Sequence, residues 1–119
     1  MGNRRTRERG AGDGARTVRL QQLIREELNF ALKGEARDAR LADVEVTMVE
    51  LSGDGSRARV WFTTPPENED DAMRALDGAA GFLRDDLAES LGLKRTPDLR
   101  FRRDPATRAF ARETREDEP

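Results

Sequence analysis

The residue types that most often carry catalysis are scarce in this sequence. Its 119 residues contain no His and no Cys, which removes the commonest neutral-pH base, the thiolate nucleophile and disulfides. The nearest approach to a catalytic or metal-binding pair is two acidic dipeptides, Asp70-Asp71 and Asp85-Asp86. Neighbouring residues on a helix point about 100° apart, so the carboxylates of each pair diverge. We therefore interpret these acids as solvated, and we predict neither an enzyme, nor a cofactor, nor a metal site.

The basic residues are the remaining candidates for contacts with a partner, and they are segregated along the chain. Residues 1–19 carry six arginines against two acids, and residues 93–104 carry five basic residues against two acids. Residues 64–92 carry eight acids against two arginines. Local basic blocks steer nucleic acid towards a protein even when its net charge is −2, and guanidinium groups bind phosphate in a bidentate manner. A biased genome composition would give the same excess of arginine over lysine.

Hydrophobic spacing predicts two helical segments. In residues 17–33 apolar side chains recur every three or four positions, beginning after a Thr17 N-cap. Residues 69–91 repeat the pattern, although Gly78 and Gly81 interrupt it. Each glycine costs about 1 kcal/mol relative to alanine inside a helix. We therefore predict a kink at this point, or a close approach of another backbone.

Three strands are predicted from alternating apolar and polar residues. Residues 43–50 and 57–63 alternate on either side of a Gly- and Asp-containing turn at 52–55, which indicates a β-hairpin. A third strand is predicted over 98–103 and must join the same sheet. The expected inward side chains are Val44, Val46 and Met48 in the first strand and Leu99 and Phe101 in the third, with Arg100 and Arg102 outward.

The helical stripes must cover one face of this sheet, which gives a two-layer α+β fold. The order α-β-β-α(kink)α-β is that of a type II KH domain. Residues 1–16 are expected to be a disordered basic arm, 17–105 the domain and 106–119 a flexible charged tail. The arm has two interpretations, an electrostatic arm for RNA or a solvated terminus. No apolar run suffices to span a bilayer and no secretory signal is evident, so we expect a cytoplasmic protein.

Several short segments resemble the ribosome-binding factor A family, and they occur in the expected order over roughly residues 17–105. The segment Ala79-Ala80-Gly81 resembles the AxG kink that this family has in place of the GxxG loop of ordinary KH domains. Asp38-Ala39-Arg40 resembles the family's Asp-Pro-Arg. The other matching segments are 19–28, 44–47, the serine and aspartate turn at 52–56, 82–84, 91–95 and 97–101.

The resemblance implies a KH-like factor without catalytic activity. It implies binding to free or immature 30S ribosomal subunits and to 16S rRNA, with a role in late 16S rRNA processing and maturation, including cold adaptation. Ribosomal proteins and an assembly GTPase are further candidate partners, and we expect a monomer that binds no membrane.

The residues that we predict to contact RNA are the basic ones near the helices and third strand, together with the small residues at the kink. Phosphate contacts would supply most of the affinity, although an ordinary solvated face would carry the same charges. Ala79 and Gly81 would bring backbone near a partner, or would allow a tight helix crossing. The predicted set is Arg19, Arg25, Lys33, Ala79, Gly81, Arg84, Lys94, Arg95, Arg100, Arg102 and Arg103.

Two aromatic residues, Trp61 and Phe82, are candidates for base stacking, although single aromatics more often serve packing. The chain also departs from the family pattern. Ala39 replaces a proline, which would loosen the loop before the first strand. Thr107-Arg108-Ala109-Phe110 replaces a Gly-containing segment, and the second helical region is strongly acidic. These acids support an alternative function, a protein–protein module that binds a basic ribosomal protein.

Overall fold

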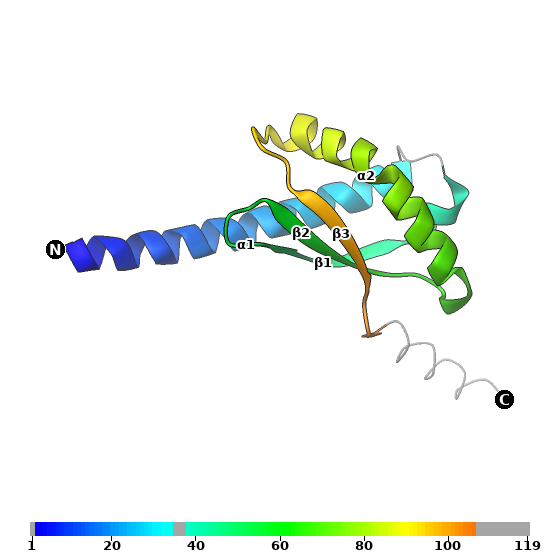
Figure 1. Cartoon of the computed structure of the whole chain (residues 1–119), viewed down its shortest axis with the longest axis horizontal. Helices are drawn as coiled ribbons and strands as arrows, with labels where there is room; N and C mark the ends of the chain where they lie inside the picture. The colour runs from blue at the N-terminus through cyan, green and yellow to red at the C-terminus, as the bar shows by residue number, and fades with distance from the viewer. Residues whose placement is uncertain (1, 35–37, 107–119) are drawn as a thin grey trace.

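The computed structural model describes residues 2–34 and 38–106, which form two long helices and one sheet (Figure 1). The helices are α1 (Gly2–Gly34) and α2 (Glu69–Leu91), and the strands are β1 (Glu45–Leu51), β2 (Arg57–Thr63) and β3 (Asp98–Arg103). Short 3-10 turns, η1 (Ala39–Leu41) and η2 (Pro66–Asn68), precede β1 and α2. The predicted α+β fold with KH-like element order is confirmed.

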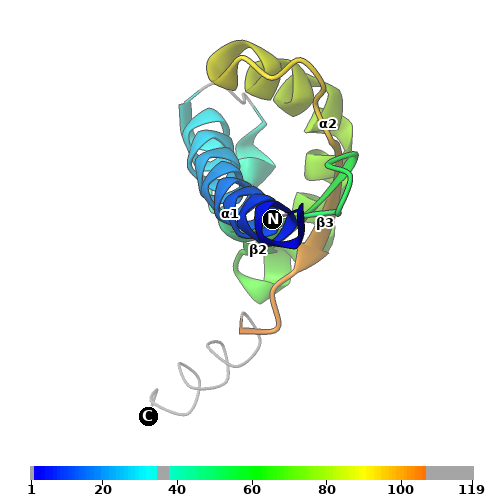
Figure 2. The same cartoon turned by 90° about the vertical axis from the view of Figure 1, so that its left-hand side faces the viewer.

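The sheet has the order β1-β2-β3. β1 and β2 form the predicted antiparallel hairpin, whereas β3 pairs in parallel with β2 because α2 returns the chain to the same end of the sheet. Figure 2 views the molecule from the N-terminal end of α1 and shows α2 arching above α1 and the sheet. The core lies between the helices and one sheet face, and its largest fully buried side chains include Ile24, Leu28, Val60, Phe62, Leu76, Leu83 and Leu87.

The first strand departs from the predicted alternation. Val46 is buried as expected, but Met48 is 48% exposed and Val49 takes the next inward position. The register against β2 shifts between Val46 and Met48, which marks a β-bulge at Thr47. The extra residue moves every later side chain to the opposite face. The prediction that Met48 faces the core is therefore wrong.

The first helix begins earlier than predicted. α1 continues back to Gly2 instead of starting at Thr17, so the expected disordered arm is helical over residues 2–16. This segment contains no proline, and its five arginines and two alanines favour helix, although its four glycines each cost about 1 kcal/mol relative to alanine. It projects away from the domain in Figure 1. Neither described helix has an apolar stretch that would cross a bilayer. The expected tail lies, apart from Ala106, outside the described residues.

The second helix is continuous from Glu69 to Leu91, and its axis bends partway along, as Figure 1 shows. Helices bend most readily where small residues such as Gly78 and Gly81 interrupt them. A Cβ atom built on Gly78 or Gly81 would meet no heavy atom within 4 Å, and both glycines are exposed. The alternative prediction, a close approach of another backbone from within the domain, is therefore wrong. The helix ends at Gly92, whose φ of 64° is the left-handed conformation that glycine adopts at a helix C-terminus.

The side of α1 that faces β1 also covers the free edge of the sheet. The Asn29 side-chain amide accepts a hydrogen bond from the Val46 backbone N–H at 2.7 Å and donates one to the Val46 carbonyl at 2.9 Å. Gln21 accepts a bond from the Leu51 N–H at 2.8 Å. These two amides replace part of the missing neighbour strand of β1, whose unpaired backbone groups would otherwise be open to pairing with other chains.

The turn between β1 and β2 is organised by one carboxylate. Asp54 Oδ1 accepts hydrogen bonds from the Ser56 backbone N–H at 3.0 Å, from the Ser56 hydroxyl at 2.8 Å and from the Ser52 hydroxyl at 2.8 Å. These donors, with the Ser56 N–H contributing most, lower the pKa of Asp54 from 3.8 to about 2. Gly55 adopts a φ of 74°, which only glycine takes without strain.

Acid should therefore weaken the hairpin through Asp54. Its pKa is lower in the folded chain, so its contribution to stability is present above pH 4 and is lost as the pH falls towards about 2. Asp54→Asn keeps an oxygen acceptor that does not titrate, so its unfolding free energy should fall less over this range. Urea unfolding at several pH values between 5 and 2 measures the slope. Ser56→Ala, which removes one donor, should give an intermediate slope, and equal slopes for wild type and Asp54→Asn would contradict the expectation.

Candidate nucleic-acid interface

The predicted RNA-contacting residues come from four elements, α1, α2, the loop after α2 and β3, and do not form one patch. Side chains alternate across a strand, so Arg100 and Arg102 project from the sheet face opposite the core residues Leu99 and Phe101. The helices cover the core face. The predicted set therefore divides into a helical side, with Arg19, Arg25, Lys33, Ala79, Gly81 and Arg84, a loop with Lys94 and Arg95, and β3 with Arg100, Arg102 and Arg103.

Two of these arginines, Arg84 and Arg103, link α2 to β3 and to the loop before it. Arg103 Nη1 donates to Glu69 Oε2 at 2.7 Å, and Glu69 is only 7% exposed in the first turn of α2. Arg84 donates to the Thr96 carbonyl at 3.4 Å and lies 3.5 Å from an Asp98 carboxylate oxygen. Both side chains thus have structural partners, which sequence spacing did not indicate.

Arg100 and Arg102 differ from that pair because both are exposed and neither forms an ion pair with any carboxylate in the described part of the chain. The register places Arg100 beside Arg59 and Arg102 beside Trp61 of β2. Arg59 was not among the predicted contacts. The cross-strand register, which brings it next to Arg100, is the signal that would have found it.

The remaining basic residues are spread more widely. Lys94 and Arg95 are exposed in the loop that joins α2 to β3. On α1, Arg19 and Lys33 are exposed, and their 14-residue separation puts them about 40° apart around the helix and about 21 Å apart along it. Arg25 is half-buried on another side of α1. No compact basic cluster forms from these residues alone.

The carboxylates of Asp85 and Asp86 diverge as predicted, but the interpretation that all these acids are solvated is wrong for Asp86, which is buried. Asp85 is exposed whereas Asp86 is 7% exposed and accepts a weak hydrogen bond from the Ser90 hydroxyl at 3.4 Å. Within the described residues no group of three or more acids could hold a metal ion. The outward surface of α2 instead carries separate carboxylates, namely Asp70, Asp71, Asp77, Asp85 and Glu89.

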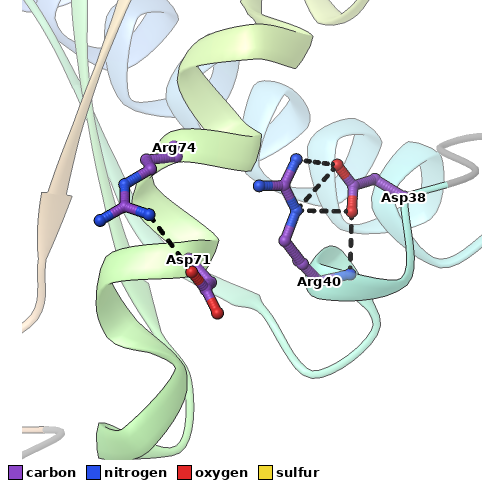
Figure 3. Close-up of polar contacts among 4 residues, drawn as sticks. All are labelled: Asp38, Arg40, Asp71 and Arg74. Atoms are coloured by element: carbon purple, nitrogen blue, oxygen red, sulfur yellow. Dashed lines mark hydrogen bonds and ion pairs between the residues drawn. The ribbon is translucent and has the colours of Figure 1, made fainter.

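An ordered charged pair lies where the loop before β1 meets α2. Asp38 accepts bonds from the Arg40 backbone N–H at 3.0 Å and from Arg40 Nη2 at 2.6 Å, and these bonds lower the pKa of Asp38 to about 2. Figure 3 shows the Arg40 guanidinium between Asp38 and the Asp71–Arg74 pair of α2. Asp71 and Arg74 lie 3.6 Å apart and are largely exposed. The network therefore orients exposed charges and does not enclose a site.

Comparison of this chain with known proteins identifies its family. The sequence profile described as "Ribosome-binding factor A" matches residues 16–115, which is most of the chain. The chain belongs to the ribosome-binding factor A family. A curated family member from Vesicomyosocius okutanii is 39% identical over 97 residues, covering 82% of this chain and 85% of that protein.

Solved structures of ribosome-binding factor A share the fold. The crystal structure of ribosome-binding factor A from Thermus thermophilus superposes with a TM-score of 0.69 and 31% identity, covering 78% of this chain and 97% of that chain. A homology model of the Thermus thermophilus protein, fitted into a cryo-EM map of a 30S–RbfA complex, gives a TM-score of 0.65 and 31% identity, covering 76% and 97% of the two chains. The family is thus one of ribosome-binding factors.

Two segments resemble motifs of the ribosome-binding factor A family, namely Asp38-Ala39-Arg40 at η1 and Ala79-Ala80-Gly81 within α2. Asp38 caps η1 and holds Arg40 although Ala39 stands in the place of the family's proline, so the turn keeps its hydrogen bonds without that residue. Ala79 is half-buried and packs against the core, whereas Gly81 is exposed in the middle of α2. No internal contact requires Gly81 to be small, because its missing Cβ would point into open space.

Proposed function

We propose that this protein binds free or immature 30S ribosomal subunits and assists late 16S rRNA processing and maturation, including growth in the cold. The proposal is supported above all by membership of the ribosome-binding factor A family, together with the relative described in a 30S complex. It acts by binding one arrangement of the rRNA in preference to another, with no bond chemistry. It works in the cytoplasm as a monomer, and ribosomal proteins or an assembly GTPase act with it.

The RNA contacts in this proposal come from side chains that the domain leaves unpaired. Arg100, Arg102, Lys94 and Arg95 are exposed and form no ion pair within the described residues, so they remain free to neutralise phosphates. Arg84 and Arg103 serve mainly to position α2 against β3. Gly81 offers exposed helix backbone in the middle of α2, where a partner can approach without meeting a side chain.

The test is co-sedimentation of the purified protein with free small subunits, large subunits and intact ribosomes over a salt series. Selective binding to small subunits, weakening steeply as salt rises, is the expected result. Binding all three particles equally, or none, would refute the proposal. Depletion of the protein should also lead to accumulation of unprocessed 16S rRNA, most strongly at low temperature.

A second function, binding of a basic ribosomal protein, is favoured by the exposed carboxylates of α2. Asp77, Asp85 and Glu89 form no ion pair within the described residues. Both functions depend on salt, so salt alone does not separate them. Protein-free 16S rRNA does: binding to it supports the RNA-binding function, whereas binding only to isolated ribosomal proteins supports the second.

Substitution of Gly81 by alanine should raise the stability of the domain and weaken its binding to small subunits. Gly81→Ala should raise the free energy of unfolding by about 0.5–1 kcal/mol, because alanine favours helix and the added Cβ meets open space. It should also weaken small-subunit binding about tenfold if a partner contacts this backbone. Gly78→Ala is the matched control and should stabilise equally without affecting binding. Unchanged binding by Gly81→Ala would remove this position from the interface.

A further inference from the structure

The sheet face opposite the helices carries an ordered row of side chains. Cross-strand pairing places Met48 beside Trp61 and Trp61 beside Arg102. The next row places Glu50 beside Arg59 and Arg59 beside Arg100. Paired residues on neighbouring strands lie about 4.8 Å apart and project from the same face, so these side chains are contiguous. We call the apolar and basic ones the outer-face patch, which comprises Met48, Arg59, Trp61, Arg100 and Arg102.

Four residues of this patch, Met48, Arg59, Arg100 and Arg102, are exposed, whereas Trp61 is half-buried. In Figure 1 the sheet lies in front of α1, and Figure 2 places β3 on the side away from α1. Met48 is 48% exposed, and it reaches this face only because of the bulge at Thr47. A bulge that turns a methionine outward next to a tryptophan creates an apolar centre on an otherwise charged face.

Trp61 presents carbon surface to solvent. The residue is half-buried, and its Nε1 atom is buried without a hydrogen-bond partner. The exposed part of the indole is therefore its apolar ring carbons. A partly buried indole held by packing loses little freedom when a flat group stacks on it, and unpaired nucleic-acid bases are such groups. Phe82, the other aromatic candidate, is 45% exposed but lies on α2, outside this patch.

The charges around Trp61 are positive and only weakly neutralised. Arg100 and Arg102 pair with no carboxylate in the described part of the chain. Arg59 lies 3.3 Å from Glu50, but both side chains are more than half exposed, and such pairs contribute little and exchange readily with other anions. Arg100 and Arg102 are two residues apart on one strand, about 6.6 Å, so one extended backbone can contact both.

We propose that the outer-face patch binds single-stranded RNA, with a base stacked on Trp61 and phosphates bound by Arg100 and Arg102. The inference rests on the proposed RNA-binding function and deepens it, because it adds Trp61 to the β3 arginines and names unpaired RNA as the ligand of this face. In duplex RNA the bases stack on one another, so a duplex would contact only the arginines. An unpaired strand can also stack a base on the Trp61 indole. The chemistry therefore favours unpaired rRNA segments.

Trp61 is the only tryptophan in the chain, so its fluorescence reports on this patch alone. We expect saturable quenching when the protein is titrated with a ten-nucleotide single-stranded oligoribonucleotide, and much weaker quenching with a duplex of equal length. Anisotropy of a labelled oligonucleotide gives the affinity. Arg102→Glu should weaken binding about tenfold and should reduce the salt slope by about 0.7, the value for one phosphate contact on a single strand.

Variants of Trp61 distinguish a loss of base stacking from a loss of folding. Trp61→Ala should weaken oligonucleotide binding at least tenfold, whereas Trp61→Phe keeps an aromatic face and should bind nearly as wild type. Arg74→Glu makes the same charge change as Arg102→Glu on exposed α2 and should leave binding unchanged. If Trp61→Ala fails to fold, the fluorescence titration and Trp61→Phe still test the proposal.

The outcomes that would overturn the proposal differ from those that would overturn the function. If an oligonucleotide binds without changing Trp61 emission, and Arg102→Glu does not weaken that binding, single-stranded RNA binds another surface of the protein. Quenching by an acidic peptide but not by RNA would make the patch a protein-binding site. Small-subunit co-sedimentation that persists without any oligonucleotide binding would refute the patch and leave the proposed function standing. Loss of co-sedimentation itself would refute that function.

Discussion

Asn29→Ala is expected to lower the free energy of unfolding by roughly 2–4 kcal/mol, a large loss for a single polar side chain. The substitution removes two hydrogen bonds, and each partly buried backbone group left without a partner costs about 1–3 kcal/mol. Both groups belong to Val46, whose N–H and carbonyl bond to Asn29 across the outer edge of β1. Little water reaches this contact because α1 packs along β1, which keeps the penalty high.

Three variants test the geometry of this contact. Gln21→Ala removes one bond, to the Leu51 N–H, and should cost about half as much. Gln22→Ala removes an exposed amide from the same helix and should cost little. Asn29→Asp keeps the acceptor for the Val46 N–H but sets a carboxylate against the Val46 carbonyl, so it should destabilise at least as much as alanine. Urea unfolding at neutral pH measures all of them.

The edge contact also predicts an effect on association. Without the Asn29 amide the outer edge of β1 offers free hydrogen-bonding groups to another chain. Asn29→Ala should therefore form oligomers at concentrations where the wild type does not, as light scattering or size-exclusion chromatography would detect. A variant that is as stable as the wild type and shows no new association would contradict the role assigned to Asn29.

Local patterns in the sequence were sufficient for the element order. The alternation in β2 and β3 and the turn around Asp54 each depend on near neighbours, and each was predicted at its observed place. Once two helices and three strands were placed, burial of their apolar sides on one sheet face left the two-layer fold as the consistent solution. The family resemblance pointed to the same fold through independent residues.

Features that depend on tertiary contacts were not predictable from spacing. The bulge at Thr47 is held by a bond from its hydroxyl to Asp104 at 2.7 Å, a residue that lies 57 positions away. Without that contact in view, period-two alternation places Met48 in the core. The pairing of Arg103 with Glu69 likewise joins two segments that are distant in sequence. For this reason, basic residues that looked equivalent in the sequence divide into structural and unpaired ones.

Arg100→Glu/Arg102→Glu is expected to weaken binding to free small subunits about 100-fold or more. Each arginine should lose one charge-assisted phosphate contact, which is about 1.5–3 kcal/mol, and each new carboxylate repels the RNA backbone. Both side chains are exposed and unpaired within the described residues, so the fold should tolerate the change. Co-sedimentation at several salt concentrations measures the loss, and the salt dependence should become shallower by about two phosphate contacts.

Lys94→Glu/Arg95→Glu makes the same charge change on the loop after α2 and identifies the face that binds. If the sheet face carries the interface, the β3 variant should lose far more affinity than the loop variant. If the loop variant alone fails to bind, the interface lies on the helical side, and Arg100 and Arg102 are solvated charges. Arg74→Glu makes half of the charge change of either double variant and controls for total charge, since its exposed side chain lies on α2 beside Asp71. A loss as large with Arg74→Glu would mean that total charge, and not the β3 arginines, governs binding to the subunit.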